Sequence, residues 1–137
     1  MQYGLEQTAS IIEKAIKANK AKLGFKTINN GSWDCIEKPL LNWSLFPIQS
    51  QLESESGYPS GFKAQLTCYI EGNGTLETTA YYKLVDNQVS NLINLLCEMR
   101  EIEFDSFIFV PGTTKDKKQK DHEVILLSCE CYYKCGE

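Results

Sequence analysis

Apolar residues recur every three or four positions in two stretches of the chain, with charged and amide side chains between them. The first stretch covers residues 6–23, where Ile11, Ile12 and Ile16 form one stripe among lysines and glutamates. This spacing predicts an amphipathic helix. Gly24 is expected to end it, because glycine readily adopts the left-handed conformation that closes a helical C-terminus.

The second stretch follows a glycine-containing break at residues 72–74 and ends near Arg100, with apolar positions such as Leu92 at helical spacing. It predicts a second amphipathic helix. The sequence leaves the start of this helix open. Thr75 is a candidate cap for a long helix, and Asp86 is a candidate cap for a shorter one.

Residues 62–70 alternate between apolar and polar side chains, the clearest two-residue period in the sequence. Such alternation predicts a strand with one buried face. Residues 43–52 also favour a strand, in which Pro47 indicates a sheet edge or a β-bulge because proline has no N–H to donate. Residues 27–39 and 53–60, rich in turn-forming residues, are interpreted as loops.

Two further strand-like runs lie near the C-terminus, at residues 104–110 and 124–133. A Pro-Gly pair is expected to close the first of them. The residues between the two runs, 111–121, carry four lysines and are interpreted as a solvated hairpin loop.

The predicted order is therefore helix, strand, strand, helix, strand, strand. Helices with one apolar stripe and strands with one apolar face bury those surfaces best against each other. We expect one α+β domain over residues 1–137, a two-layer sandwich in which two helices pack on a mostly antiparallel sheet of about four strands.

Composition narrows the classes of function. The chain has 137 residues, 42% hydrophobic and 23% charged, as expected for one globular domain. Its net charge is −4, and Arg100 is its only arginine, which argues against tight phosphate recognition. No run of 18 apolar residues and no signal peptide are recognisable, so neither a membrane span nor secretion is expected.

The six cysteines are the most conspicuous candidates for chemistry. Cys129, Cys131 and Cys135 stand close together, and three thiolates could hold a metal ion. Their spacing does not match a zinc site, which pairs ligands across turns, and a fourth ligand would have to come from the set Cys35, Cys68, Cys97 and His122. We expect the thiols to be reduced and to pack in the core, because free cysteine behaves as a small apolar residue.

Catalytic patterns are not recognisable in the sequence. His122 is the only histidine, so any histidine-dependent mechanism must use it, but its position beside Asp121 in a lysine-rich segment predicts an ordinary solvated side chain. No nucleophile elbow, zinc-protease motif or phosphate-binding loop is present. We therefore expect no enzymatic activity, no catalytic or metal-binding residues and no cofactor.

The order of elements resembles that of the tail terminator (tail completion) proteins of tailed bacteriophages. The resemblance rests on the opening helix, the entry of Leu45-Phe46-Pro47-Ile48 into a strand, the alternating strand at residues 62–70, the helix through Leu92, and two closing strands. It covers most of the chain as a pattern of elements, without a residue motif.

This resemblance implies a structural virion protein of the tail and neck that assembles in the host cytoplasm. It implies a ring, typically a hexamer, that caps the tail tube and joins it to the head connector, and that lets DNA pass through its lumen. Residues 53–60 and 111–121 are candidate contacts to neighbouring rings. The cysteine-rich C-terminus departs from the family pattern and keeps a thiol- or metal-binding domain open as the alternative. A hydrolase or transferase using His122 ranks third.

Overall fold

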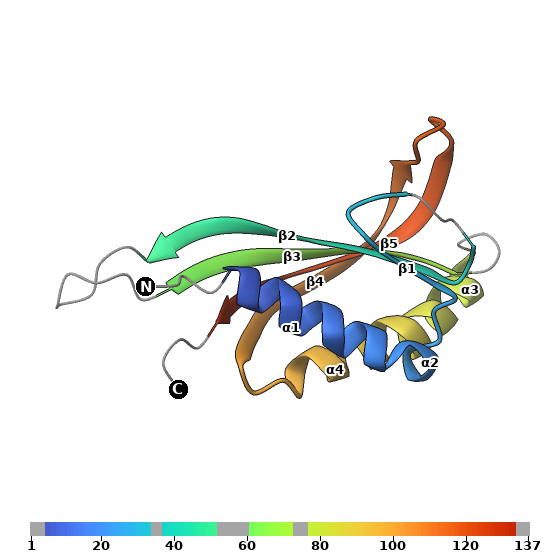
Figure 1. Cartoon of the computed structure of the whole chain (residues 1–137). Coiled ribbons are helices and arrows are strands. Elements are labelled where there is room, and N and C mark those ends of the chain that lie inside the picture. The colour runs from blue at the N-terminus through green and yellow to red at the C-terminus, as the bar shows by residue number, and fades with distance from the viewer. Residues whose placement is uncertain (1–4, 34–36, 52–60, 73–76, 134–137) are drawn as a thin grey trace, which may run out of the picture.

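A computed structural model describes residues 5–33, 37–51, 61–72 and 77–133. One five-stranded sheet forms the centre of the molecule, and the helices lie together on one of its faces (Figure 1). The prediction of an α+β fold is confirmed. The predicted loop at residues 53–60 falls outside the described residues.

The strands are β1 (Thr27–Asn30), β2 (Leu40–Gln51), β3 (Gly61–Glu71), β4 (Ile102–Lys115) and β5 (Asp121–Tyr133), arranged in the order β1-β2-β3-β5-β4. All neighbouring strands are antiparallel except β1 and β2, which are parallel. The prediction of a loop over residues 27–39 is therefore wrong for its first four residues. Their asparagines favour a loop locally, but pairing with the start of β2 overrides that preference.

The first helical segment consists of α1 (Leu5–Ala18) and the short α2 (Lys20–Leu23), separated by a turn at Asn19. Gly24 ends the segment as predicted: its φ is 82°, and its N–H donates to the carbonyl of Lys20 at 3.0 Å. The interruption at Asn19 was not predicted. The Asn19 side chain donates to the carbonyl of Ala15 at 2.8 Å, which offers the backbone an alternative to a continuous helix.

The second helical segment consists of α3 (Thr78–Leu84), a π-helical turn (Val85–Val89) and α4 (Ser90–Cys97). Asp86 lies inside this segment, so the shorter helix that it would cap is not the one that forms. The Ser90 hydroxyl donates to the carbonyl of Val85 at 2.8 Å across the widened turn.

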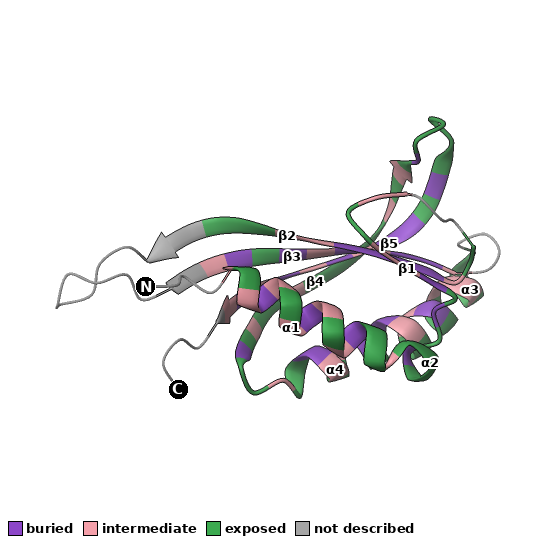
Figure 2. Ribbon diagram, viewed as in Figure 1, coloured by how far each residue is buried: buried purple, intermediate pink, exposed green. Residues whose placement is uncertain are grey.

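The core lies between the sheet and the helices, as Figure 2 shows. The alternation predicted for β3 is confirmed, because its even-numbered residues from Ala64 to Ile70 are buried and the intervening ones are not. They belong to one cluster with the stripes of both helical segments, which include Ile12, Ile16 and Leu92. The pairing predicted between the last two strands is also present.

The β4–β5 hairpin is longer than predicted. β4 continues through the Pro-Gly pair to Lys115, so the expected solvated loop at residues 111–121 shrinks to a tight turn around Lys117–Gln119. β3 pairs with β5 only as far as Ile70 and Ile125. The rest of the hairpin, residues 111–124, extends beyond β3 and bends away from the helices; we call it the arm (Figure 1).

Two strands change register along their length. In β2 the register with β3 shifts between Pro47 and Gln49, which confirms the prediction that Pro47 marks an edge or a bulge. Among the described residues, β1 covers only the start of β2, so Pro47 lies on an uncovered stretch. In β4 the register with β5 shifts between Asp105 and Ile108, where Ser106 has a φ of 58°.

Candidate functional site

The only histidine is buried at the arm, on the face of the sheet opposite the helices. The His122 side chain is 7% exposed. Its Nδ1 lies 2.8 Å from Glu71 Oε1 and its Nε2 lies 2.8 Å from Asp116 Oδ2. The expectation of a solvated histidine is wrong, because β5 turns this position toward the end of β3 and toward the hairpin turn.

Both ring nitrogens therefore face carboxylate oxygens, which accept but do not donate when ionised. Both contacts are hydrogen bonds only if the imidazole carries both protons. Burial by itself lowers the pKa of His122, but the hydrogen bonds and charges of Asp116 and Glu71 outweigh burial and raise the pKa above its ordinary value of 6.5. The geometry thus favours an imidazolium between two carboxylates.

Asp116 joins His122 to the turn of the arm. Its Oδ1 accepts the backbone N–H of Lys118 at 2.8 Å and that of Lys120 at 3.1 Å. The hydrogen bond to His122 is the main reason that the pKa of Asp116 falls to about 2, and the two backbone donors lower it further against the effect of burial. Asp116 therefore stays ionised at all ordinary pH values and fixes the turn.

Two residues from the connection between β1 and β2 complete the cluster. The Trp33 ring stacks on His122 with centroids 5.1 Å apart and an interplanar angle of 25°. Lys38 Nζ lies 3.0 Å from Glu71 Oε2. Together Trp33, Lys38, Glu71, Asp116 and His122 form what we call the clasp, with two positive and two negative side chains beside one indole.

The arrangement of the clasp suits a structural role better than a chemical one. A general base needs a ring nitrogen that can take a proton, and a metal ligand needs a free lone pair, whereas both nitrogens of His122 are occupied by Glu71 and Asp116. Within the described ranges no group of three His, Cys, Asp or Glu side chains is placed to hold a metal ion. The clasp fastens the arm to the sheet.

The thiols are distributed mostly as expected. Cys68, Cys129 and Cys131 are buried between the sheet and the helices, which confirms core packing for these three. Burial is the main cause that raises the pKa of Cys129 and of Cys131 to about 12, so both stay protonated at neutral pH. Core packing is wrong for Cys97, which is exposed at the end of α4. Cys35 and Cys135 fall outside the described residues.

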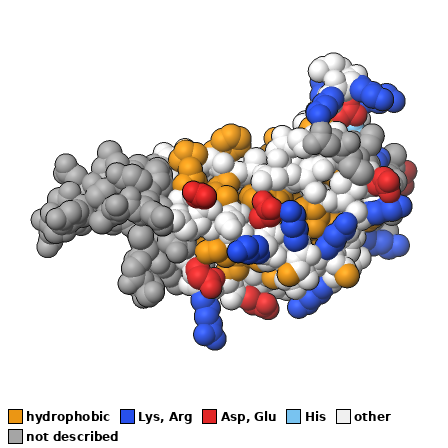
Figure 3. Space-filling model, viewed as in Figure 1, with side chains coloured by type: hydrophobic (Ala, Val, Ile, Leu, Met, Phe, Trp, Pro, Cys, Tyr) orange, Lys and Arg blue, Asp and Glu red, His pale blue; other side chains and the backbone are white. Residues whose placement is uncertain are grey.

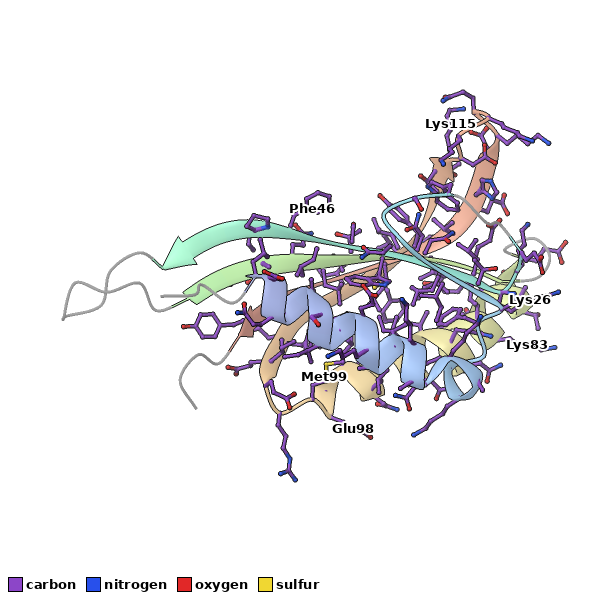
Figure 4. All side chains as sticks on the ribbon, viewed as in Figure 1. Lys26, Phe46, Lys83, Glu98, Met99 and Lys115 are labelled. Carbon is purple, nitrogen blue, oxygen red and sulfur yellow. The ribbon has the colours of Figure 1, made fainter. Side chains whose placement is uncertain are left out.

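Exposed apolar side chains gather on β2 and β4, two strands that lie near opposite edges of the sheet. On β2, Phe46 is 59% exposed and Ile48 is 46% exposed. On β4, Ile108 is 60%, Phe109 is 38% and Val110 is 44% exposed. Figure 4 shows Phe46 on the side of the sheet that faces away from the helices. We call these two groups the β2 edge patch and the β4 edge patch.

Charge is also unevenly distributed. Residues 115–120, at the turn of the arm, carry four lysines and one aspartate, a net charge of +3. Figure 3 shows Lys side chains gathered there. Residues 98–105, which lead from α4 into β4, carry four carboxylates and Arg100, a net charge of −3, and all five of these side chains are exposed. The two ends of β4 are thus oppositely charged.

Comparison with known proteins gives no match: no protein-family model matches the chain, and no curated protein matches it. In the described part of the chain, no helix is both long enough and apolar enough to cross a membrane.

Sequence reasoning missed the clasp and the two edge patches. A local signal existed for Asp116, because an aspartate that opens a turn commonly accepts a backbone N–H two residues on. No local signal existed for the burial of His122, whose partner Glu71 lies 51 residues away. The exposure of Ile108 and Val110 depends on the register shift in β4, which the alternation does not reveal.

Proposed function

We propose that this chain is a structural, non-enzymatic protein that assembles into a ring, in the manner of the tail terminators of tailed bacteriophages. In that role the ring, expected to be a hexamer, caps the tail tube and joins it to the head connector. The observation that supports it is the presence of two different apolar patches, the β2 edge patch and the β4 edge patch, on opposite sides of one sheet.

A ring closes through a head-to-tail contact, so each subunit needs two different surfaces that complement each other. Exposed apolar side chains on sheet edges are the usual sites at which strands of neighbouring chains pair. β4 runs antiparallel to β2, because all three successive strand pairs that connect them, β2–β3, β3–β5 and β5–β4, are antiparallel. The β2 edge of a second subunit therefore extends the sheet beside β4 in the antiparallel sense, without a reversal of either subunit.

The arm supplies a contact of another kind. It projects beyond the sheet, carries the lysine-rich turn, and is held in place by the clasp. A rigid projection loses little conformational entropy on binding, which suits a contact to a neighbouring ring or to the connector. The acidic remainder of the chain suits a lumen that passes DNA without gripping it.

Head-to-tail assembly is tested by mixing two variants in the presence of the cognate tail tube. Phe46→Lys disables the β2 edge patch and Ile108→Lys disables the β4 edge patch, and each alone is expected to block ring formation. Mixed together, the two variants retain one intact contact and should form a single dimer on native mass spectrometry, at twice 15.6 kDa, and no larger species.

Tyr82→Lys is the matched control, because Tyr82 is 60% exposed but lies on α3, away from both strands. It should leave rings intact. Wild-type protein that fails to cap the tube, or tails of normal length that join heads without the protein, would show that the terminator role is wrong. Deletion of residues 115–120 tests the role of the arm independently of ring closure. Rings should still form, but their attachment to the connector should weaken.

The alternative, a thiol- or metal-binding domain, needs thiolates that are accessible at neutral pH. Cys129 and Cys131 are buried and their pKa lies at about 12, which weighs against them as ligands. The decisive measurement is metal content: stoichiometric zinc in the purified protein, together with unfolding on chelation, would favour this alternative over the ring.

A further inference from the structure

The β4 edge has features that a head-to-tail ring does not require. β4 is 14 residues long and forms the outer strand of the sheet, and within the described chain no strand pairs with its free side. Its exposed apolar residues, the β4 edge patch, lie near its middle. Its acidic end and its lysine-rich end lie about 40 Å apart at roughly 3.3 Å per residue.

We infer that β4 pairs antiparallel with β4 of a second copy of this chain, in a two-fold symmetric dimer of the free protein. This inference does not depend on the ring proposal. In this dimer the β4 edge patch of one copy contacts the β4 edge patch of the other.

The pattern of charge along β4 selects this occupant. An antiparallel pair places the lysine-rich end of each strand alongside the acidic end of the other, so charges of +3 and −3 are matched at both ends. A parallel pair would bring like charges together. The complementarity is present twice, because the two-fold axis repeats every contact.

The register follows from which face each side chain occupies. Ile108 pairs with Ser128 and Val110 pairs with Leu126, so both lie on the face of the sheet opposite the helices, and Phe109 lies on the other face. Directly opposed residues of an antiparallel pair share a face. A two-fold axis through Phe109 satisfies this rule: Phe109 meets Phe109 of the second copy, and Ile108 meets Val110 of the second copy.

Two features of β4 limit the length over which it can pair with a second copy. The register shift at Ser106 interrupts the pairing on one side, and Pro111 lacks an N–H on the other, which are two common ways in which edge strands limit association. A contact confined to a few residues is weak and depends on the charged ends. The dimer and the head-to-tail ring contact use the same edge, so the dimer must open before a ring can close.

Site-specific cross-linking distinguishes the two contacts. In a background with Ser at Cys35, Cys97 and Cys135, Phe109→Cys is treated with a short bis-maleimide linker in the absence of tail tube. The inference predicts a covalent dimer, because only a residue on a two-fold axis lies opposite itself. Glu103→Cys alone should not cross-link, but an equal mixture of Glu103→Cys and Thr114→Cys should.

A mixture of Ile108→Cys and Phe46→Cys, whose side chains lie on the same face of the sheet, tests the head-to-tail contact in the same assay. If this mixture cross-links and Phe109→Cys alone does not, the two-fold dimer is wrong and the ring contact gains support. If none of the variants cross-links and untreated wild-type protein sediments as a 15.6 kDa monomer at every concentration, the two-fold dimer is also wrong, while ring assembly on the tube is still decided by its own assay.

Salt supplies an independent readout on wild-type protein. Raising the salt concentration from 50 to 500 mM is expected to weaken the dimer about tenfold in analytical ultracentrifugation, because its charged ends are exposed to solvent. Lys117→Glu combined with Lys118→Glu should weaken it similarly at low salt, whereas Lys14→Glu combined with Lys17→Glu, a matched change on α1, should not. A dimer insensitive to both treatments would overturn the role of the charged ends.

Discussion

The two faces of the sheet are stabilised in opposite ways. On the helix-covered face, Leu66, Leu92 and their neighbours bury apolar surface over a wide area, and no single pair of atoms determines the arrangement. On the opposite face, the clasp joins four segments of the chain through hydrogen bonds and charges around one imidazole. The first face stabilises the whole domain, and the second positions one projecting element.

This difference gives the two regions different sensitivities. Loss of core surface lowers the free energy of unfolding of the whole molecule, whereas loss of a clasp residue should act mainly on the arm, because the arm extends beyond the point where β3 pairs with β5. The clasp does not act mainly on the arm if a clasp variant destabilises the domain as much as a core variant, or if the arm stays ordered without the clasp.

The largest expected effect is that of a cavity in the core. Leu66→Ala should lower the free energy of unfolding by about 2 to 5 kcal/mol, because Leu66 is fully buried in the middle of β3. Urea denaturation measures this change. Gln65→Ala, at the exposed neighbouring position, is the control and should change stability by less than about 0.5 kcal/mol.

Removal of one carboxylate from the clasp should have a smaller and more local effect. Glu71→Ala leaves Nδ1 of buried His122 without its partner, which should cost about 1 to 3 kcal/mol. Hydrogen exchange should accelerate most at the amides of Lys118 and Lys120, whose acceptor Asp116 is oriented by the clasp. Uniform acceleration across the whole sheet would mean that the clasp is part of the global core. Glu103→Ala, at an exposed position, is the matched control.

The pH dependence of the clasp sharpens the comparison further, because the apolar core does not titrate. The pKa of His122 is raised on folding, so its stabilising contribution is complete below about 6.5 and is lost as the pH rises through the higher folded value. The pKa of Asp116 is lowered to about 2, so its contribution is present above 3.8 and is lost as the pH falls toward 2. NMR titration of the His122 ring should give a midpoint above 6.5; a midpoint below it would contradict the charged state.

The smallest expected effects concern the thiols outside the core. Cys97→Ser should change the free energy of unfolding by less than about 0.5 kcal/mol, because Cys97 is exposed. Cys135→Ser is expected to be equally neutral. Cys68→Ser, which introduces a hydroxyl into the buried face of β3, should cost about 1 to 3 kcal/mol. Thermal unfolding of the three variants side by side tests this order.

The sequence allowed the helix-covered face to be predicted because its signals are periodic and local. The alternation in β3 and the stripes of Ile12, Ile16 and Leu92 each repeat over several turns or residues, so errors at single positions cancel. β1 escaped prediction because four residues are too few to show a period. Its pairing with β2 is a tertiary contact that no local pattern records.

The clasp and the edge patches could not be predicted for a different reason. His122 and Glu71 come together only because β3 and β5 are neighbours and because β3 ends at that point. Trp33 is a large side chain in a polar segment, but its stacking on His122 depends on how that segment crosses the sheet. Cys97 was expected to pack in the core with the other thiols, but the buried positions of α4 are Leu92 and Leu96, and Cys97 lies outside their stripe.

The register shift in β4 changes which positions along the strand face the helices. Phe104 pairs with Cys131 and Phe109 pairs with Leu127, so both lie on the helix side although they are five positions apart, which in a regular strand would put them on opposite sides. One additional residue near Ser106 lets Ile108 and Val110 face outward although Phe104, an even number of positions before each of them, faces the helices. Deletion of one residue there would make the pairing regular, with Ile108 still opposite Ser128 and Val110 still opposite Leu126, so both would still face outward. What such a deletion removes is the interruption of the edge strand, so homologues without the extra residue are expected to present a longer regular edge and to associate more strongly.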